Sequence, residues 1–214
     1  MKSKLKLKKA QIRSFFLSFE KKGITKKEIE NDLLLTGLEY VQMKLPVSNI
    51  TPEVEEKLKK KVEHNILRAK MREAKLEDLD SVMYIYNRSW LVSSTPFRPI
   101  KKETLKIIYE YSETKILIAR AYGSDAAFVI LDYEGPNNEY GIIAGLGVIP
   151  RFQRKGLGTV IGMAAWNYFK KKDVKELRCE VFKDNKVSFD FIKSIGFEEF
   201  ARKTYKSEDF YTDS

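Results

Sequence analysis

The sequence predicts an α+β fold, in which a mixed, mostly antiparallel twisted sheet is flanked by helices and preceded by a helical N-terminal extension. Three observations lead to this prediction. The hydrophobic period is helical over the first third of the chain, β-rich runs separated by turn residues follow after residue 70, and helical and β-rich stretches alternate after residue 150. We therefore divide the chain into a basic helical region, residues 1–69, and an α+β domain, residues 70–214.

The N-terminal region is expected to form three helices. Apolar residues at helical spacing, closed by a glycine, predict the first over residues 12–23. A capping-box pattern at Thr25 predicts a second helix that continues through Val41. Thr51, followed by a proline that suits the first helical position, predicts a third helix that ends near Ala69.

The remainder of the chain predicts short strands and amphipathic helices. Strand candidates are rich in β-branched and aromatic residues and end at turn residues, whereas helix candidates repeat apolar residues at helical spacing. The strands are expected over residues 69–75, 115–122, 125–133, 139–150 and 175–182 and from Phe197 onward, and the helices over residues 77–90, 101–112, about 156–171 and 185–194.

Composition excludes several classes of protein. No apolar run approaches the ~20 residues that a membrane-spanning helix needs, and the first residues are too charged for a signal peptide, so we expect a cytoplasmic protein without a membrane partner. Cys179 is the only cysteine and His64 the only histidine, so neither an internal disulfide nor a Cys/His metal site can form. We expect no bound metal, although a magnesium site made only of carboxylates stays open.

The net charge of +10 favours an anionic partner, such as a nucleic acid or a phosphorylated ligand. Most of the excess lies in residues 1–69, which hold sixteen Lys and Arg against nine Asp and Glu.

A glycine-containing turn, "IPRFQRKGLGT", joins an expected strand to an expected helix. The strand ends at Pro150, which cannot donate to a sheet, and the helix begins near Gly156. First-turn amides of a helix have no intrahelical acceptors, and residues without a Cβ, here Gly156 and Gly158, would let a phosphate approach them. Ile161 stands where a GxGxxG motif needs glycine, and no Gly-Lys-Ser/Thr sequence follows, so neither a dinucleotide-binding nor a P-loop motif is present.

Residues Gln153 to Gly158 resemble the Q/R-x-x-G-x-G/A signature of the GCN5-related N-acetyltransferases, the GNAT superfamily. "DNKVSFDFIKSIGF" resembles the second signature of that family, and the similarity covers about residues 70–204. The resemblance implies a GNAT-like fold and acetyl-CoA as the acetyl donor. By motif position, the residues at the cofactor would be Leu146, Gly147, Val148, Gln153, Arg154, Lys155, Gly156, Gly158, Thr159 and Asn185. The strand backbone at 146–148 would pair with the pantetheine arm, amides of the turn would hold the pyrophosphate, and Asn185 would bind the pantetheine or the thiol end.

Acetyl transfer to an amine needs a group that accepts a proton, because an amine with a pKa near ~10.4 is mostly protonated at neutral pH. Glu180 is the candidate base, and the alternative is an ion pair between its carboxylate and Arg178 or a neighbouring lysine. The family commonly uses a tyrosine to protonate the leaving thiolate, but Ile192 occupies that position here. Tyr205 and Tyr211, near the C-terminus, are candidates to replace it.

The segment "SWLVSSTPFRPIKK" corresponds to a loop that helps to form the acceptor site in the family. Trp90, Phe97 and Arg98 are therefore candidate substrate contacts, with core packing as the other explanation for the aromatic residues. The segment contains no acidic residue, which favours an acceptor that carries a carboxylate or a phosphate.

Two functional classes remain open. The chain is expected to be an N-acetyltransferase with an amine-bearing small molecule or protein as acceptor. The alternative is a non-catalytic acetyl-CoA-binding or nucleic-acid-binding regulator, because Ile192 replaces the family tyrosine and a faint helix-turn-helix pattern runs from Thr25 to Leu45. A packing or dimerising role for the N-terminal helices is also open. The expected sheet ends early, so these helices or a second copy in a homodimer would complete it.

Overall fold

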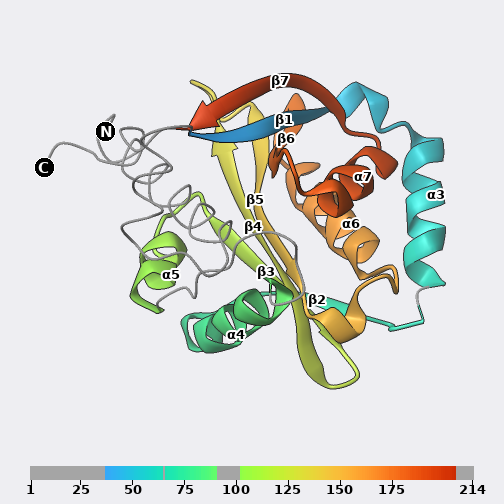
Figure 1. The fold of residues 1–214 in the computed structure, drawn as a ribbon. Coiled ribbons are helices and arrows are strands. Elements are labelled where there is room, and N and C mark those ends of the chain that lie inside the picture. Colours follow the sequence, from blue (N-terminus) through green and yellow to red (C-terminus); the bar gives the residue numbers. More distant parts are fainter. Residues whose placement is uncertain (1–36, 65, 91–101, 206–214) are drawn as a thin grey trace, which may run out of the picture.

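The computed structural model describes residues 37–64, 66–90 and 102–205. One seven-stranded sheet, with the strand order β2-β3-β4-β5-β6-β1-β7, forms the centre of the molecule (Figure 1). Helices α4 and α5 lie on one side of the sheet and α6, α7 and α3 on the other (Figure 1). We call these sides the α4 face and the α6 face. The predicted α+β class, with a mixed and mostly antiparallel sheet, is confirmed.

The strands alternate with helices along most of the chain. The strands are β1 (Leu38–Pro46), β2 (Lys70–Glu73), β3 (Lys115–Ala121), β4 (Ser124–Glu134), β5 (Tyr140–Val148), β6 (Glu176–Phe182) and β7 (Glu198–Tyr205). The α-helices are α3 (Pro52–Glu63), α4 (Leu79–Trp90), α5 (Lys102–Tyr109), α6 (Leu157–Phe169) and α7 (Lys186–Ser194), and short 3₁₀ turns lie at Val47–Asn49, Leu76–Asp78 and Pro150–Phe152.

Strand β1 corrects the expectation of a helix through Val41. Apolar side chains at Val41, Met43 and Leu45 are buried and alternate with polar ones, which is the two-residue period of a strand. β1 lies between β6 and β7 and pairs with both in antiparallel orientation. The prediction of a second helix in the faint helix-turn-helix pattern is therefore wrong, because the burial of alternate side chains in a sheet decides the structure of this segment. The first expected helix lies outside the described residues.

The start of α3 follows the sequence prediction. The Thr51 side chain accepts a hydrogen bond from the N–H of Val54 at 3.4 Å, and a proline occupies the first helical position. The helix ends at Glu63, several residues before Ala69. It packs on α6, so the described part of residues 1–69 contributes a strand next to the edge strand β7 and a covering helix to the same core as the rest of the chain.

The sheet needs no second chain for its last strand. β7 is eight residues long, and β1 of the same chain covers its inner edge. None of the helices in the described ranges has the length and apolar content required to cross a bilayer.

Candidate active site

The parallel pair β5 and β6 separates halfway along its length. Their pairing runs from Tyr140 opposite Glu176 to Ile143 opposite Cys179 and then stops, although both strands continue and are described in full. The register between β4 and β5 skips Ala144 at this point, which makes it a β-bulge. The bulge bends β5 away from β6, and the backbone from Ala144 to Val148 leaves the ladder with β6. The sheet thus opens at the strand end predicted to receive the pantetheine arm.

The glycine turn follows directly from the open end of β5. Gly156 is the N-cap of α6 with φ 79°, and Arg154 also has a positive φ of 57°. Gln153 donates its side-chain amide to the carbonyl of Val148 at 2.8 Å, which ties the turn to the strand. This bond is consistent with the expected role of Gln153 in shaping the turn. The glycine turn and the start of α6 therefore follow the end of β5 that has separated from β6.

Gly158 and the N–H of Thr159 each have a structural role in this turn besides the expected contact with a phosphate. A Cβ on Gly158 would lie 2.8 Å from the ring of Phe191 in α7, so this glycine is required by helix packing as well as suited to a phosphate. The N–H of Thr159 donates to the carbonyl of Gly156 at 3.1 Å, so a phosphate would share that donor. The amides of Gly156 and Gly158 precede this first bond of the helix.

Glu180 and Tyr205 are in direct contact. The Tyr205 hydroxyl donates a hydrogen bond to Glu180 Oε1 at 2.8 Å, although the two residues lie on β6 and β7 with β1 between them. Tyr205 is buried, and its ring packs edge-on against Tyr40 of β1 with centroids 5.5 Å apart. Glu180 is the first residue of β6 after the pairing with β5 ends. A carboxylate and a phenol therefore stand together beside the opening in the sheet.

The side chains of β6 alternate between the two faces of the sheet. Leu177 lines a cavity together with Met163 and Trp166 of α6, so residues 177, 179 and 181 point toward the α6 face and Glu180 points toward the α4 face. Arg178, on the same face as Glu180, donates a hydrogen bond to Glu176, and its guanidinium lies over the ring of Tyr140 with Cζ 3.5 Å from the ring centroid. Glu176 is thus the acidic partner of Arg178.

Cys179 and Ile192 have packing roles. Cys179 is buried on the α6 face, and burial, together with the neighbouring Glu180 charge, raises the pKa of its thiol far above the usual range. Ile192, at the position of the family tyrosine, packs against the core. The Asn185 side chain accepts a hydrogen bond from the N–H of Ser188 at 3.1 Å and so caps α7.

Phe97, Arg98 and Tyr211 lie outside the described residues, as does the side chain of Trp90. Sequence reasoning in turn missed Gln42, which lies on β1 directly opposite Glu180. The alternation of apolar and polar residues through 41–45 is the signal that could have identified this strand.

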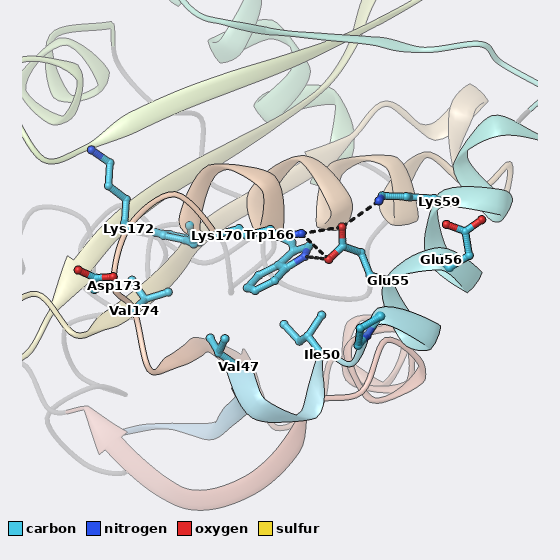
Figure 2. Close-up of a pocket in the computed structure, with 12 residues that line it drawn as sticks. Val47, Ile50, Glu55, Glu56, Lys59, Trp166, Lys170, Lys172, Asp173 and Val174 are labelled. Carbon is cyan, nitrogen blue, oxygen red and sulfur yellow. Dashed lines mark hydrogen bonds and ion pairs between the residues drawn. The ribbon is translucent and has the colours of Figure 1, made fainter.

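A separate pocket of about 640 Å³ lies between α3 and the C-terminal end of α6 (Figure 2). Its main feature is Glu55, which is buried and accepts hydrogen bonds from Trp166 Nε1 at 3.2 Å and from Lys170 Nζ at 2.8 and 2.9 Å. Lys59 Nζ lies 3.0 Å from the same carboxylate (Figure 2). These donors hold the pKa of Glu55 at about 2, with the bond from Lys170 as the largest cause. The network anchors α3 to α6, and none of the cofactor or catalytic candidates in the described residues lines this pocket.

A family model described as the acetyltransferase (GNAT) family matches residues 79–197, which is more than half of the chain. Solved structures with the same fold include the ribosomal-protein-S18-alanine N-acetyltransferase of Escherichia coli, at 21% identity and a TM-score of 0.53 over 62% of this chain and 79% of that one.

Two further structures extend the comparison. AAC(6')-Iy in complex with a CoA-containing bisubstrate analogue has 17% identity and a TM-score of 0.54 over 68% of this chain and 98% of that one. A functionally unknown conserved protein of Staphylococcus epidermidis has 12% identity and a TM-score of 0.58 over 86% of this chain and 67% of that one. No curated protein gives a significant match. At such identities the solved structures show the fold alone.

Proposed function

The chain belongs to the GNAT acetyltransferase family, and we propose that it moves the acetyl group of acetyl-CoA to an amine by direct attack in a ternary complex. The observation that supports this proposal most is the arrangement around the opening between β5 and β6. The glycine turn lies at one end of this opening, and the Glu180–Tyr205 pair lies beside it on the α4 face.

The donor is proposed to enter between β5 and β6. The amides of Arg154, Gly156 and Gly158 would hold the pyrophosphate, because a helix N-terminus combines free N–H donors with a favourable dipole. The side chain of Lys155 would add a positive charge. Along β5, the backbone at 146–148 would pair with the amides of the pantetheine arm, as a neighbouring strand would.

Two further contacts with acetyl-CoA are proposed, one from Asn185 at the start of α7 and one from Thr159 in α6. Asn185 uses its side-chain oxygen to cap this helix, which leaves its NH₂ group to donate to the pantetheine. The Thr159 amide would add a shared bond to the pyrophosphate.

Glu180 and Tyr205 are proposed to move the protons. Glu180 accepts a proton from the attacking amine, and Tyr205 donates its hydroxyl proton to the departing sulfur. The hydrogen bond between them then lets protonated Glu180 return a proton to Tyr205, so that each turnover consumes one amine and one thioester and yields one amide and one thiol. This pair would replace the tyrosine that the family commonly places where Ile192 stands.

The acceptor is an amine of a small molecule or a protein. Trp90, Phe97 and Arg98 are proposed to contact it, because Trp90 ends α4 and the other two precede α5 in the sequence, and both helices lie on the side of the sheet toward which Glu180 points (Figure 1). The acceptor would therefore reach the thioester from the α4 face.

A free-thiol assay with acetyl-CoA and a panel of amines tests this proposal. We expect Glu180→Gln to lower kcat/KM by about 10²-fold or more, the usual effect of losing a general base or acid, while the affinity for acetyl-CoA stays the same. Tyr205→Phe should lower kcat with little change in either KM. Glu199→Gln, which removes an exposed carboxylate of β7, is the control and should retain activity. Acetyl-CoA binding without turnover of any amine would instead support a non-catalytic binder.

A further inference from the structure

We propose that Gln42 of β1 recognises the acceptor, by donating a hydrogen bond from its side-chain amide to an oxygen on the carbon next to the amine-bearing carbon. The inference rests on the proposed function, in which Glu180 takes the proton from that amine. It assigns a substrate contact to the N-terminal strand.

The register of the sheet places Gln42 beside the proposed base. Gln42 pairs directly with Glu180 across the antiparallel β1–β6 ladder, so the two side chains share one face with their Cβ atoms about 4.5–5.5 Å apart. Leu45 of β1 lines the cavity under α6, and alternation along the strand then directs Gln42 toward the α4 face. On its other side Gln42 is paired with Ala201 of β7, whose side chain is a single methyl group.

The amide of Gln42 lacks the partner that a buried donor normally has. Its Nε2 is shielded from solvent and has no hydrogen-bond partner in the structure as described. A shielded N–H without an acceptor is unfavourable, and such groups in native proteins usually have a protein, water or ligand partner. An oxygen of the acceptor would satisfy this donor in the ternary complex.

The separation of the two side chains selects a class of acceptor. The amine must lie at the Glu180 carboxylate, and the hydrogen-bonded oxygen must lie within reach of an amide about one cross-strand spacing away. An α-amino amide, such as a peptide N-terminus, carries its carbonyl oxygen on the adjacent carbon and fits this requirement. A vicinal amino alcohol shares the same chemistry. A simple alkylamine or a lysine side chain has no oxygen at that position.

The test compares acceptors rather than absolute rates. The full-length protein is assayed with alaninamide and with 1-amino-2-propanol, which carry the oxygen, and with isopropylamine, which lacks it. For each variant, kcat/KM of the oxygen-bearing acceptor is divided by that of isopropylamine, and comparing this ratio with that of the wild type cancels the intrinsic reactivity of the amines. We expect Gln42→Leu to lower this ratio about tenfold, the effect of losing one net hydrogen bond, and to leave KM for acetyl-CoA unchanged. The two oxygen-bearing acceptors distinguish a carbonyl from a hydroxyl partner.

Two further variants control for structure. Lys44→Leu changes the next residue of β1 on the same face and should leave the ratio unchanged. Gln42→Met keeps the length of the side chain but has neither an N–H donor nor a charge, so it should reproduce the loss even where Gln42→Leu fails to fold.

An unchanged ratio, or an equal loss with all three acceptors, would overturn the assignment of Gln42. A rise in KM for acetyl-CoA would overturn it as well. A wild-type protein that acetylates no amine at all would overturn the proposed function, and this inference with it.

Discussion

Replacing Glu55 with glutamine should weaken the attachment of α3 to α6 in a pH-dependent way. The glutamine keeps the shape of the side chain and an oxygen for Trp166, but it removes the negative charge that Lys59 and Lys170 approach within 3.0 Å (Figure 2). Glu55 is 8% exposed, whereas each lysine side chain is about half exposed. A hydrogen bond to a charged group contributes about 1.5–3 kcal/mol. Because solvent screens the lysines, we expect the whole substitution to cost about 2 kcal/mol.

The same contacts fix the sign of the pH dependence. The donors lower the pKa of Glu55 from 4.5 to about 2 in the folded protein. The unfolded chain therefore binds this proton more readily, and the stabilisation by Glu55 is present above about pH 5 and is lost as the pH falls from about 4.5 toward about 2. The difference in unfolding free energy between the wild type and Glu55→Gln should follow the same course.

Urea unfolding followed by circular dichroism measures this difference at neutral pH and at several acidic values. Glu56→Gln is the matched control, because Glu56 is the next residue, is exposed and lies 4.0 Å from its lysine partner. We expect this control to change the free energy by less than about 0.5 kcal/mol. A variant as stable as the wild type at neutral pH, or a difference that persists unchanged at low pH, would refute the reasoning.

Three further predictions concern the opening in the sheet. Gly158→Ala should lower the thermal midpoint of unfolding, because its Cβ would lie 2.8 Å from the ring of Phe191, and adding Phe191→Leu should restore part of the loss. A Gly158→Ala protein as stable as the wild type would contradict the packing role of this glycine. Gly156→Ala should weaken acetyl-CoA binding, measured by calorimetry, because it distorts the turn. Gly123→Ala, at a similar φ of 76° in an open turn, is the control and should lose stability but not affinity for acetyl-CoA. Equal affinity in both variants would rule out a role for the glycine turn in binding acetyl-CoA. Cys179 should resist alkylation in the native protein and react after unfolding, because burial raises the pKa of its thiol; rapid labelling of the folded chain would show that the site is more open than described.

Local sequence patterns determined the elements that depend on neighbouring residues. Thr51 and Pro52 specify the start of α3 because a cap and a fixed φ act within one turn. The glycine turn specifies the start of α6 because Gly156 needs a left-handed conformation that few residues adopt. The order of strands and helices after residue 70 followed from hydrophobic period, which was enough to predict the α+β fold, and two motifs similar to the family signatures supported the resemblance to GNAT acetyltransferases.

The tertiary structure decided what depends on residues distant in sequence. The alternation through residues 41–45 is compatible with a strand, but its place between β6 and β7 depends on pairing with segments distant in sequence. That insertion brings Gln42 beside Glu180 and lets Tyr205 reach Glu180 across β1, so the proposed acid and base meet only in the folded sheet. The sequence suggested both residues separately. Their contact exists because backbone pairing between distant segments, rather than helical or strand propensity, sets the distances between side chains on a sheet.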